Sequence, residues 1–78
     1  MSEFADRVAA ELRRARELHK KPINSPLEGY GVIAEELDEY FHGQRKPKQT
    51  EAEQLAELIQ IGAMAQRAAE DLGYVPKG

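Results

Sequence analysis

Apolar residues return every three or four positions along three stretches of this chain, which is the period of one face of an α-helix. No stretch alternates apolar and polar residues as a half-buried strand does. We therefore predict an all-α fold that forms a single domain over residues 1–78. Helices are expected at about residues 3–20, 26–42 and 51–72.

Capping signals stand at the start of the second and third expected helices. Ser25 and Glu28 flank a first-turn proline, and Thr50 and Glu53 repeat the same spacing before the longest periodic stretch. In each pair the hydroxyl accepts a hydrogen bond from the first turn, and the glutamate accepts one in return from the capping residue. Both pairs therefore predict a capping box.

Prolines and glycines predict where the helices end and where they approach other groups. Pro22 ends the first helix, Gly43 is placed to cap the second in the left-handed conformation, and Gly73 stops the third. Gly29 and Gly31 weaken the first turns of the second helix by about 1 kcal/mol each relative to alanine. We expect these two glycines to permit close approach of another backbone or a ligand.

The chain is too small to be strongly stabilised by one core alone. It has 78 residues and no cysteine, so disulfides contribute nothing to its stability. Its 41% hydrophobic and 32% charged residues describe an ordinary folded protein rather than a disordered one. Stabilisation by a metal ion, by a partner chain or by both is therefore expected.

The second and third helices are expected to pair as an antiparallel hairpin, because the turn between them is short. The apolar stripe of the third helix is wider than one neighbouring helix covers. Either the N-terminal helix covers the rest, or two hairpins associate into a four-helix-bundle core. We favour the second alternative, a homodimer or homotetramer built by close packing of the small residues between Gly62 and Ala69.

Sequence patterns also limit the location and the partners. No run approaches the roughly 20 apolar residues of a membrane span, and no signal segment begins the chain, so a cytoplasmic protein without membrane contact is expected. A net charge of −3 argues against binding to a nucleic-acid polymer. Two basic clusters remain to be explained: Arg13, Arg14, Arg16, Lys20 and Lys21 in the first, and Arg45, Lys46 and Lys48 in the second.

The segment "EELDEY", residues 35–40, concentrates acidic residues on one helix. Glu35 and Glu36 lie three or four positions from Glu39, so their like charges repel across one face by roughly 0.2–0.5 kcal/mol per pair. Residues 27–43 hold five acids and no lysine or arginine. An ordinary solvated face would mix both signs.

A further acid on the third helix, Glu57, is expected at the level of Glu36 and Glu39 across the hairpin. Carboxylates converging from two helices suit a hard cation, Mg²⁺ or Mn²⁺. The alternative is an acidic surface that only keeps the protein soluble, since glutamate is also a favoured helix former. Spacing alone leaves both alternatives open.

The motif "EELDE" resembles the E-E-x-x-E signature of the MazG-like, all-α nucleoside triphosphate pyrophosphohydrolases. The segment "ELIQIGAMAQRAAEDLG" is similar to the helix that carries the second signature of that family, E-x-x-D, and "EGYGVIAEELDEY" also resembles small prokaryotic and phage members. The resemblance covers about residues 23–73. It implies an oligomer of helical hairpins that uses Mg²⁺ to cleave a nucleoside triphosphate into a monophosphate and pyrophosphate.

By this resemblance, Glu36, Glu39, Glu57 and Gln60 become candidate metal-site residues, and Glu35 a candidate to orient or deprotonate the attacking water. Gln60 stands where the family has aspartate, which removes one carboxylate from the expected set. The phosphates would be bound by basic side chains from both clusters. The candidates are Lys20, Lys21, Arg45, Lys46 and Lys48.

Two functions follow from these residues. The first is a Mg²⁺-dependent nucleotide pyrophosphohydrolase, favoured by the four glutamates that match the family pattern. The second is a catalytically impaired helical scaffold that binds nucleotides or other proteins, favoured by Gln60 and by the lack of a further C-terminal helix.

Overall fold

The computed structural model describes residues 2–45 and 49–77, and within these ranges it is helical without strands. Its elements are α1 (Glu3–Leu18), α2 (Pro26–Arg45) and α3 (Glu51–Asp71), so the predicted all-α class and the order of the three helices are confirmed. In the part of the chain that is described, no helix is both long and apolar enough to cross a membrane.

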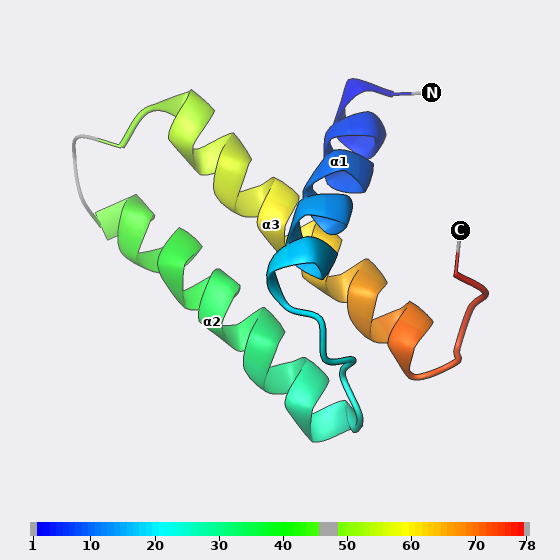
Figure 1. Cartoon of the computed structure of the whole chain (residues 1–78). Coiled ribbons are helices and arrows are strands. Elements are labelled where there is room, and N and C mark those ends of the chain that lie inside the picture. The colour runs from blue at the N-terminus through cyan, green and yellow to red at the C-terminus, as the bar shows by residue number, and fades with distance from the viewer. Residues whose placement is uncertain (1, 46–48, 78) are drawn as a thin grey trace.

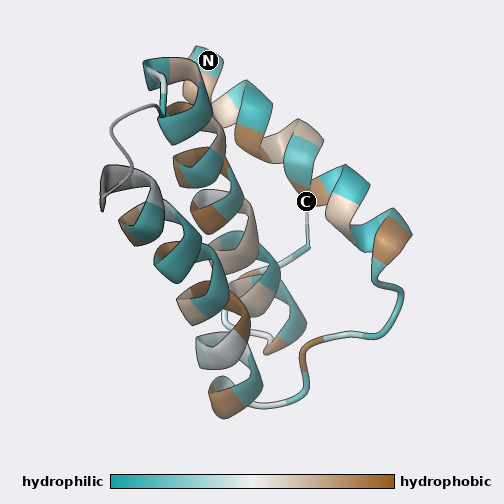
Figure 2. Ribbon diagram, turned by 90° about the vertical axis from the view of Figure 1, so that its left-hand side faces the viewer, coloured by the Kyte–Doolittle hydropathy of each residue, from teal (hydrophilic) through white to brown (hydrophobic). Residues whose placement is uncertain are grey.

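The central element is α3, because it packs closely against both of the other helices. Figures 1 and 2 show α2 beside α3 as an antiparallel hairpin, with α1 crossing α3 on another side. An extended segment, residues 19–25, leads from the end of α1 to the start of α2. The predicted hairpin is therefore present, and α1 is a separate cover on α3.

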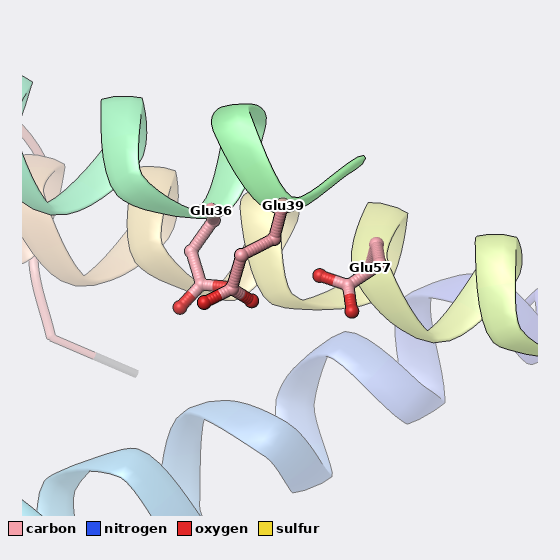
Figure 3. Close-up of side chains that lie close together, drawn as sticks. All are labelled: Glu36, Glu39 and Glu57. Carbon is pink, nitrogen blue, oxygen red and sulfur yellow. The ribbon is translucent and has the colours of Figure 1, made fainter. Parts of the chain in front are cut away.

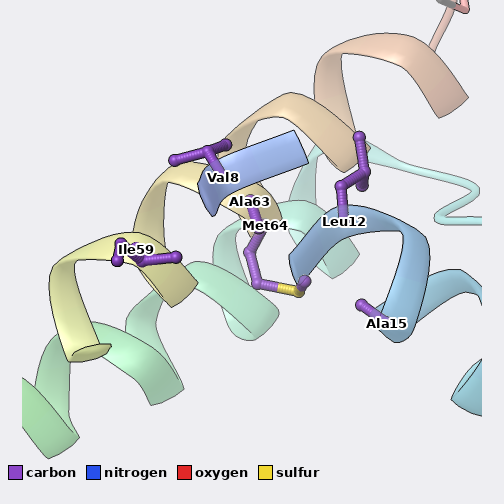
Figure 4. Packing of buried hydrophobic residues seen from close by; sticks show 6 residues of the cluster. All are labelled: Val8, Leu12, Ala15, Ile59, Ala63 and Met64. Carbon is purple, nitrogen blue, oxygen red and sulfur yellow. The ribbon is translucent and has the colours of Figure 1, made fainter. Parts of the chain in front are cut away.

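The core lies between α1 and α3 (Figure 4). Ala63 is fully buried there, and a Cβ atom on Gly62 would lie 3.2 Å from Val8 Cγ2, so small residues on α3 allow α1 to approach closely. The N-terminal helix thus covers this face of α3, and the favoured alternative, a second hairpin packed on the small residues between Gly62 and Ala69, is wrong for this face. The buried cluster consists of Val8, Leu12, Ala15, Ile59, Ala63 and Met64.

One face of α2 remains exposed. Leu27, Tyr30, Leu37 and Phe41 are 77%, 69%, 53% and 55% exposed, respectively. Tyr30, Leu37 and Phe41 belong to the apolar period from which the second helix was predicted. In the structure, a neighbouring face of α2 packs towards the core instead, through residues that include Ile33. The uncovered apolar face therefore belongs to α2 rather than to α3.

The capping predictions hold in full for α3 and in part for α2. Thr50 Oγ1 accepts from Glu53 N at 3.1 Å, and the Glu53 carboxylate accepts from Thr50 N at 2.9 Å, which completes the predicted box. Ser25 Oγ accepts from Glu28 N at 3.1 Å. The Glu28 carboxylate, however, accepts from Asn24 N at 3.2 Å, one residue before the position that a capping box uses.

Some helices end where glycine and proline predicted, and others do not. The third helix ends at Asp71, close to the stop predicted at Gly73, and Gly73 has φ 78°. The prediction for Gly43 is wrong, because α2 continues through it to Arg45. The first helix ends at Leu18, before Pro22. At Gly29 a side chain rather than a backbone makes the expected close approach, because Ala68 Cβ lies 3.3 Å from where a Cβ atom would lie. At Gly31 no close approach is found, since nothing in the described part of the chain lies within 4 Å of such an atom.

A buried carboxylate, Asp71 at the end of α3, joins α1 and the 19–25 segment to that helix. Its fully buried side chain accepts a hydrogen bond from Arg16 Nη1 at 2.9 Å and another from Ile23 N at 2.9 Å. Arg67 Nε lies 3.8 Å from Asp71 Oδ2, while its Nη2 donates to the Lys21 carbonyl at 3.0 Å. These contacts fix the path of the chain between α1 and α2.

We expect Asp71→Asn to lower the free energy of unfolding by about 3 kcal/mol, because it leaves the buried Arg67 without its counter-charge. Burial alone would raise the pKa of Asp71, but the hydrogen bonds from Ile23 and Arg16 and the charge of Arg16 outweigh it and hold the pKa below 3.8. The stabilisation is therefore complete above about pH 4 and is lost as pH falls through the lowered pKa. Urea unfolding at several pH values measures it.

Asp38→Asn is the matched control, because Asp38 is exposed on α2. Its free energy of unfolding should stay within about 0.5 kcal/mol of the wild-type value. Equal losses in the two variants would show that Asp71 does not join the elements as described.

Candidate metal centre

Carboxylates from two helices converge on one point. Glu36 and Glu39 come from α2 and Glu57 from α3, and one ligand oxygen from each lies within 4.8 Å of the others. Figure 3 shows the three side chains directed to one side of the hairpin, the side on which α1 lies. The convergence predicted from the sequence is therefore present.

The geometry follows from helix periodicity and from the antiparallel pairing. Glu36 and Glu39 are three residues apart, so both side chains leave the same face of α2. Glu57 lies in the second turn of α3, and the pairing brings that turn beside the turn of α2 that carries Glu39. The packing of α2 on α3 holds together charges that would otherwise move apart.

The cluster retains protons more strongly than isolated glutamates do. Burial raises the pKa of Glu36 to about 7, with further contributions from the negative charges of Glu39, Glu57, Glu35 and Glu11. Burial, and then the charge of Glu39, also raises the pKa of Glu57. Without a cation, Glu36 and Glu57 therefore keep their protons to higher pH than isolated glutamates do.

Two oxygens of the cluster are buried and lack a hydrogen-bond partner, namely Glu36 Oε2 and Glu57 Oε2. Nearly all buried polar atoms in folded proteins have a partner, so both atoms require an explanation. Oxygen-only ligation from carboxylates suits a hard divalent cation such as Mg²⁺ or Mn²⁺. These residues could hold such an ion with both unpaired oxygens available to it.

The predicted catalytic residue Glu35 lies next to this cluster rather than in it. Its side chain is exposed, and it lines a cavity of about 710 Å³ together with Glu36. Lys20 and Lys21 line the same cavity from the 19–25 segment. Two of the predicted phosphate-binding residues thus share a cavity with Glu35 and Glu36, whereas Glu39 and Glu57 are not among the residues that line it.

The other predicted site residues lie elsewhere or outside the description. Gln60 lines a separate cavity of about 270 Å³ between α3 and α1, where Glu11 and Arg14 are among its neighbours. Arg45 is the last residue of α2, and its side chain is not described. Lys46 and Lys48 lie outside the described residues.

Three residues near the carboxylates were missed by the sequence reasoning. Glu11 and Arg14 of α1 are close enough for electrostatic coupling to Glu36, and they bind each other through Arg14 Nη2 and Glu11 Oε2 at 2.6 Å. Arg67 lines the cavity that contains Glu35 and is itself only 7% exposed. A signal existed for Arg67 alone, because an arginine among the apolar residues of the third helix is unusual.

Comparison of the chain with protein-family models, with curated proteins and with solved structures found no match.

We expect the metal-free protein to lose stability as the pH rises from about 4.5 to about 7. The folded state keeps a proton on Glu36 that the unfolded chain releases near pH 4.5, so ionisation in this range favours unfolding. Glu36→Gln should remove this contribution and raise the free energy of unfolding at pH 8 by roughly 1 kcal/mol, since partial solvation screens the effect. Thermal unfolding in a chelator across this range measures it.

Glu17→Gln serves as the control, because Glu17 is exposed on α1. It should follow the wild-type pH dependence throughout. If Glu36→Gln also followed the wild-type pH dependence, the raised pKa of Glu36 would not destabilise the folded state at high pH.

Proposed function

We propose that this chain is a Mg²⁺-dependent nucleoside triphosphate pyrophosphohydrolase that releases a nucleoside monophosphate and pyrophosphate. The observation that carries the proposal is the convergence of the Glu36, Glu39 and Glu57 carboxylates within 4.8 Å. The motif resemblance described above supports the same chemistry. Mn²⁺ would serve in place of Mg²⁺, because both prefer oxygen ligands.

The three clustered glutamates would hold the ion, whereas Gln60, the fourth residue of the predicted set, lines a separate cavity. Mg²⁺ at this position supplies positive charge for the triphosphate oxygens and makes water more acidic. Gln60 has a neutral amide, so the protein contributes less negative charge than the family pattern would. A nucleotide then supplies part of the charge that the ion requires.

The reaction assigned to the neighbouring side chains is hydrolysis of the anhydride between two phosphates. The water oxygen forms a new bond to phosphorus while the bond to the pyrophosphate leaving group breaks. Glu35 accepts the proton from this water, because it is solvent-exposed and lines the same cavity as Glu36. Lys20 and Lys21 bind phosphate oxygens from the opposite wall, and Arg45, Lys46 and Lys48 are the further candidates for that role.

The functional unit that we propose is a homodimer or homotetramer with a four-helix core. Exposed apolar residues lie along one face of α2, and with Ala34 their spacing alternates between three and four positions. They are Leu27, Tyr30, Leu37 and Phe41. That repeat is the seam by which two helices pack along their length. A second copy of α2 is thus the proposed partner of this face.

A second function has one specific observation in its favour. Gln60, in place of an aspartate, lines the cavity on the α1 side and contributes no charge. An oligomer that binds nucleotides or other proteins without turnover would keep the helical scaffold and need no complete metal site. Turnover distinguishes the two functions directly.

For the enzyme, we expect Glu36→Gln and Glu39→Gln each to lower turnover by at least about 100-fold, because each removes a proposed metal ligand. Both variants should stay folded, since each also removes repulsion between like charges. Pyrophosphate release from a panel of canonical and modified nucleoside triphosphates, with Mg²⁺ or Mn²⁺, measures the effect.

The matched control for this test is again Glu17→Gln, which should retain wild-type activity. Full activity in both cluster variants would contradict the assignment of the site. A folded wild-type protein that hydrolyses none of the nucleotides would favour the scaffold function instead.

For the assembly, we expect Leu37→Glu to convert the protein to a monomer of 8.8 kDa, because it places a charge in the proposed helix seam. The wild type should have two or four times that mass by light scattering coupled to gel filtration. Val75→Glu is the control, since Val75 is also about half exposed but lies beyond α3. A monomeric wild type, or equal effects of both substitutions, would contradict the proposal that α2 forms the interface.

A further inference from the structure

The 19–25 segment forms one wall of the larger cavity and carries its lysines. Lys20 and Lys21 line this wall, while Glu35 and Glu36 line the α2 side. The volume of about 710 Å³ is within the usual range of small-molecule sites. The position of the segment therefore decides how far its positive charges lie from the carboxylates.

Side chains of α3 hold this segment in place. Arg67 Nη2 donates to the Lys21 carbonyl at 3.0 Å, and Asp71 Oδ2 accepts from Ile23 N at 2.9 Å. The Ile23 side chain is 3% exposed, so it anchors the segment by burial as well. The segment has no helical hydrogen bonds of its own between residues 20 and 24, which makes these contacts its main restraints.

Arg67 is an unusual residue for its position. It lies on the core side of α3, only 7% exposed, with Nη1 3.9 Å from Met64 Sδ and Nε 3.8 Å from Asp71 Oδ2. Burial of an arginine costs several kcal/mol unless its charge is paired, and an apolar side chain would fill the same volume without that cost. What an apolar side chain lacks is the hydrogen bond to the Lys21 carbonyl.

We propose that Arg67 is a positioning residue for polyphosphate binding, which holds the Lys20–Lys21 wall of the cavity at a fixed place opposite Glu35 and Glu36. Its guanidinium acts through the Lys21 carbonyl and does not itself touch the phosphates. The ligand class is the polyphosphate chain of a nucleotide together with a divalent cation. This inference rests on the proposed function, because it assumes that the cavity receives the phosphates.

The test uses Arg67→Lys, which keeps the buried positive charge but lacks the planar fork that reaches both the carbonyl and Asp71. Titration calorimetry with tripolyphosphate in saturating Mn²⁺ should give a dissociation constant about tenfold higher than that of the wild type. Binding of Mn²⁺ alone should be unchanged. In nucleotide hydrolysis, KM should rise by a similar factor while kcat stays within about twofold.

A double-mutant cycle separates positioning from direct contact. In a chain that already carries Lys20→Ala and Lys21→Ala, Arg67→Lys should weaken tripolyphosphate binding no further, because the groups that it positions are gone. An undiminished effect in that background would mean that Arg67 contacts the phosphates itself, and would overturn the proposal.

Arg16→Gln is the matched control for stability. It removes the other arginine that pairs with Asp71 but leaves the bond between Arg67 and the Lys21 carbonyl in place. It should lower the melting temperature without changing tripolyphosphate affinity. If it weakened binding as much as Arg67→Lys does, general loss of stability would account for the effect and the proposal would fall.

A second variant tests the proposal if Arg67→Lys does not fold. Pro22→Gly loosens the same segment at an exposed position without altering Arg67. It should raise the dissociation constant for tripolyphosphate about threefold with Mn²⁺ affinity intact, and wild-type affinity would contradict the proposal.

Two outcomes separate this inference from the proposed function. A wild-type chain that binds no tripolyphosphate would contradict both. Normal binding by folded Arg67→Lys would contradict the inference alone.

Discussion

Repulsion among Glu36, Glu39 and Glu57 is the interaction on which the candidate metal centre depends. Their oxygens lie within 4.8 Å of one another, a spacing that isolated glutamates avoid. Packing of α2 on α3 maintains the spacing, and the close approach of Gly29 to Ala68 permits that packing. Part of the folding energy is thus stored as electrostatic strain, which a proton or a cation relieves. Burial, and then repulsion by the neighbouring glutamates, raises the pKa of Glu36 to about 7.

Two lysines, Lys20 and Lys21, line the cavity that Glu36 also lines. The segment between α1 and α2 has no helical structure to define the place of Lys20 and Lys21. Arg67 and Asp71, both buried at the C-terminal end of α3, fix its backbone instead. One helix therefore supplies a carboxylate near its start and the restraints on the cationic wall near its end. The acids that line the cavity with these lysines, Glu28, Glu35 and Glu36, come from α2.

The helices and the carboxylate cluster were accessible from the sequence because they depend on local rules. The box at Thr50 and the left-handed turn at Gly73 follow from backbone geometry within a few residues. The pairing of Glu57 with the acids of α2 required only the period of a helix and a short turn. Gly43 was misread because a glycine also fits inside a helix, and nothing in its immediate neighbours distinguishes the two cases.

The sequence by itself determined the all-α class, the order of the three helices and the face of each that carries apolar or acidic residues. Tertiary structure alone decided which faces meet: α1 covers α3, and Leu37 and Phe41 of α2 remain exposed. It also decided that Arg67 reaches the Lys21 carbonyl, a contact between residues 46 positions apart. The physical reason is that a periodic pattern fixes directions around a helix axis, whereas the choice of neighbour depends on packing between distant segments.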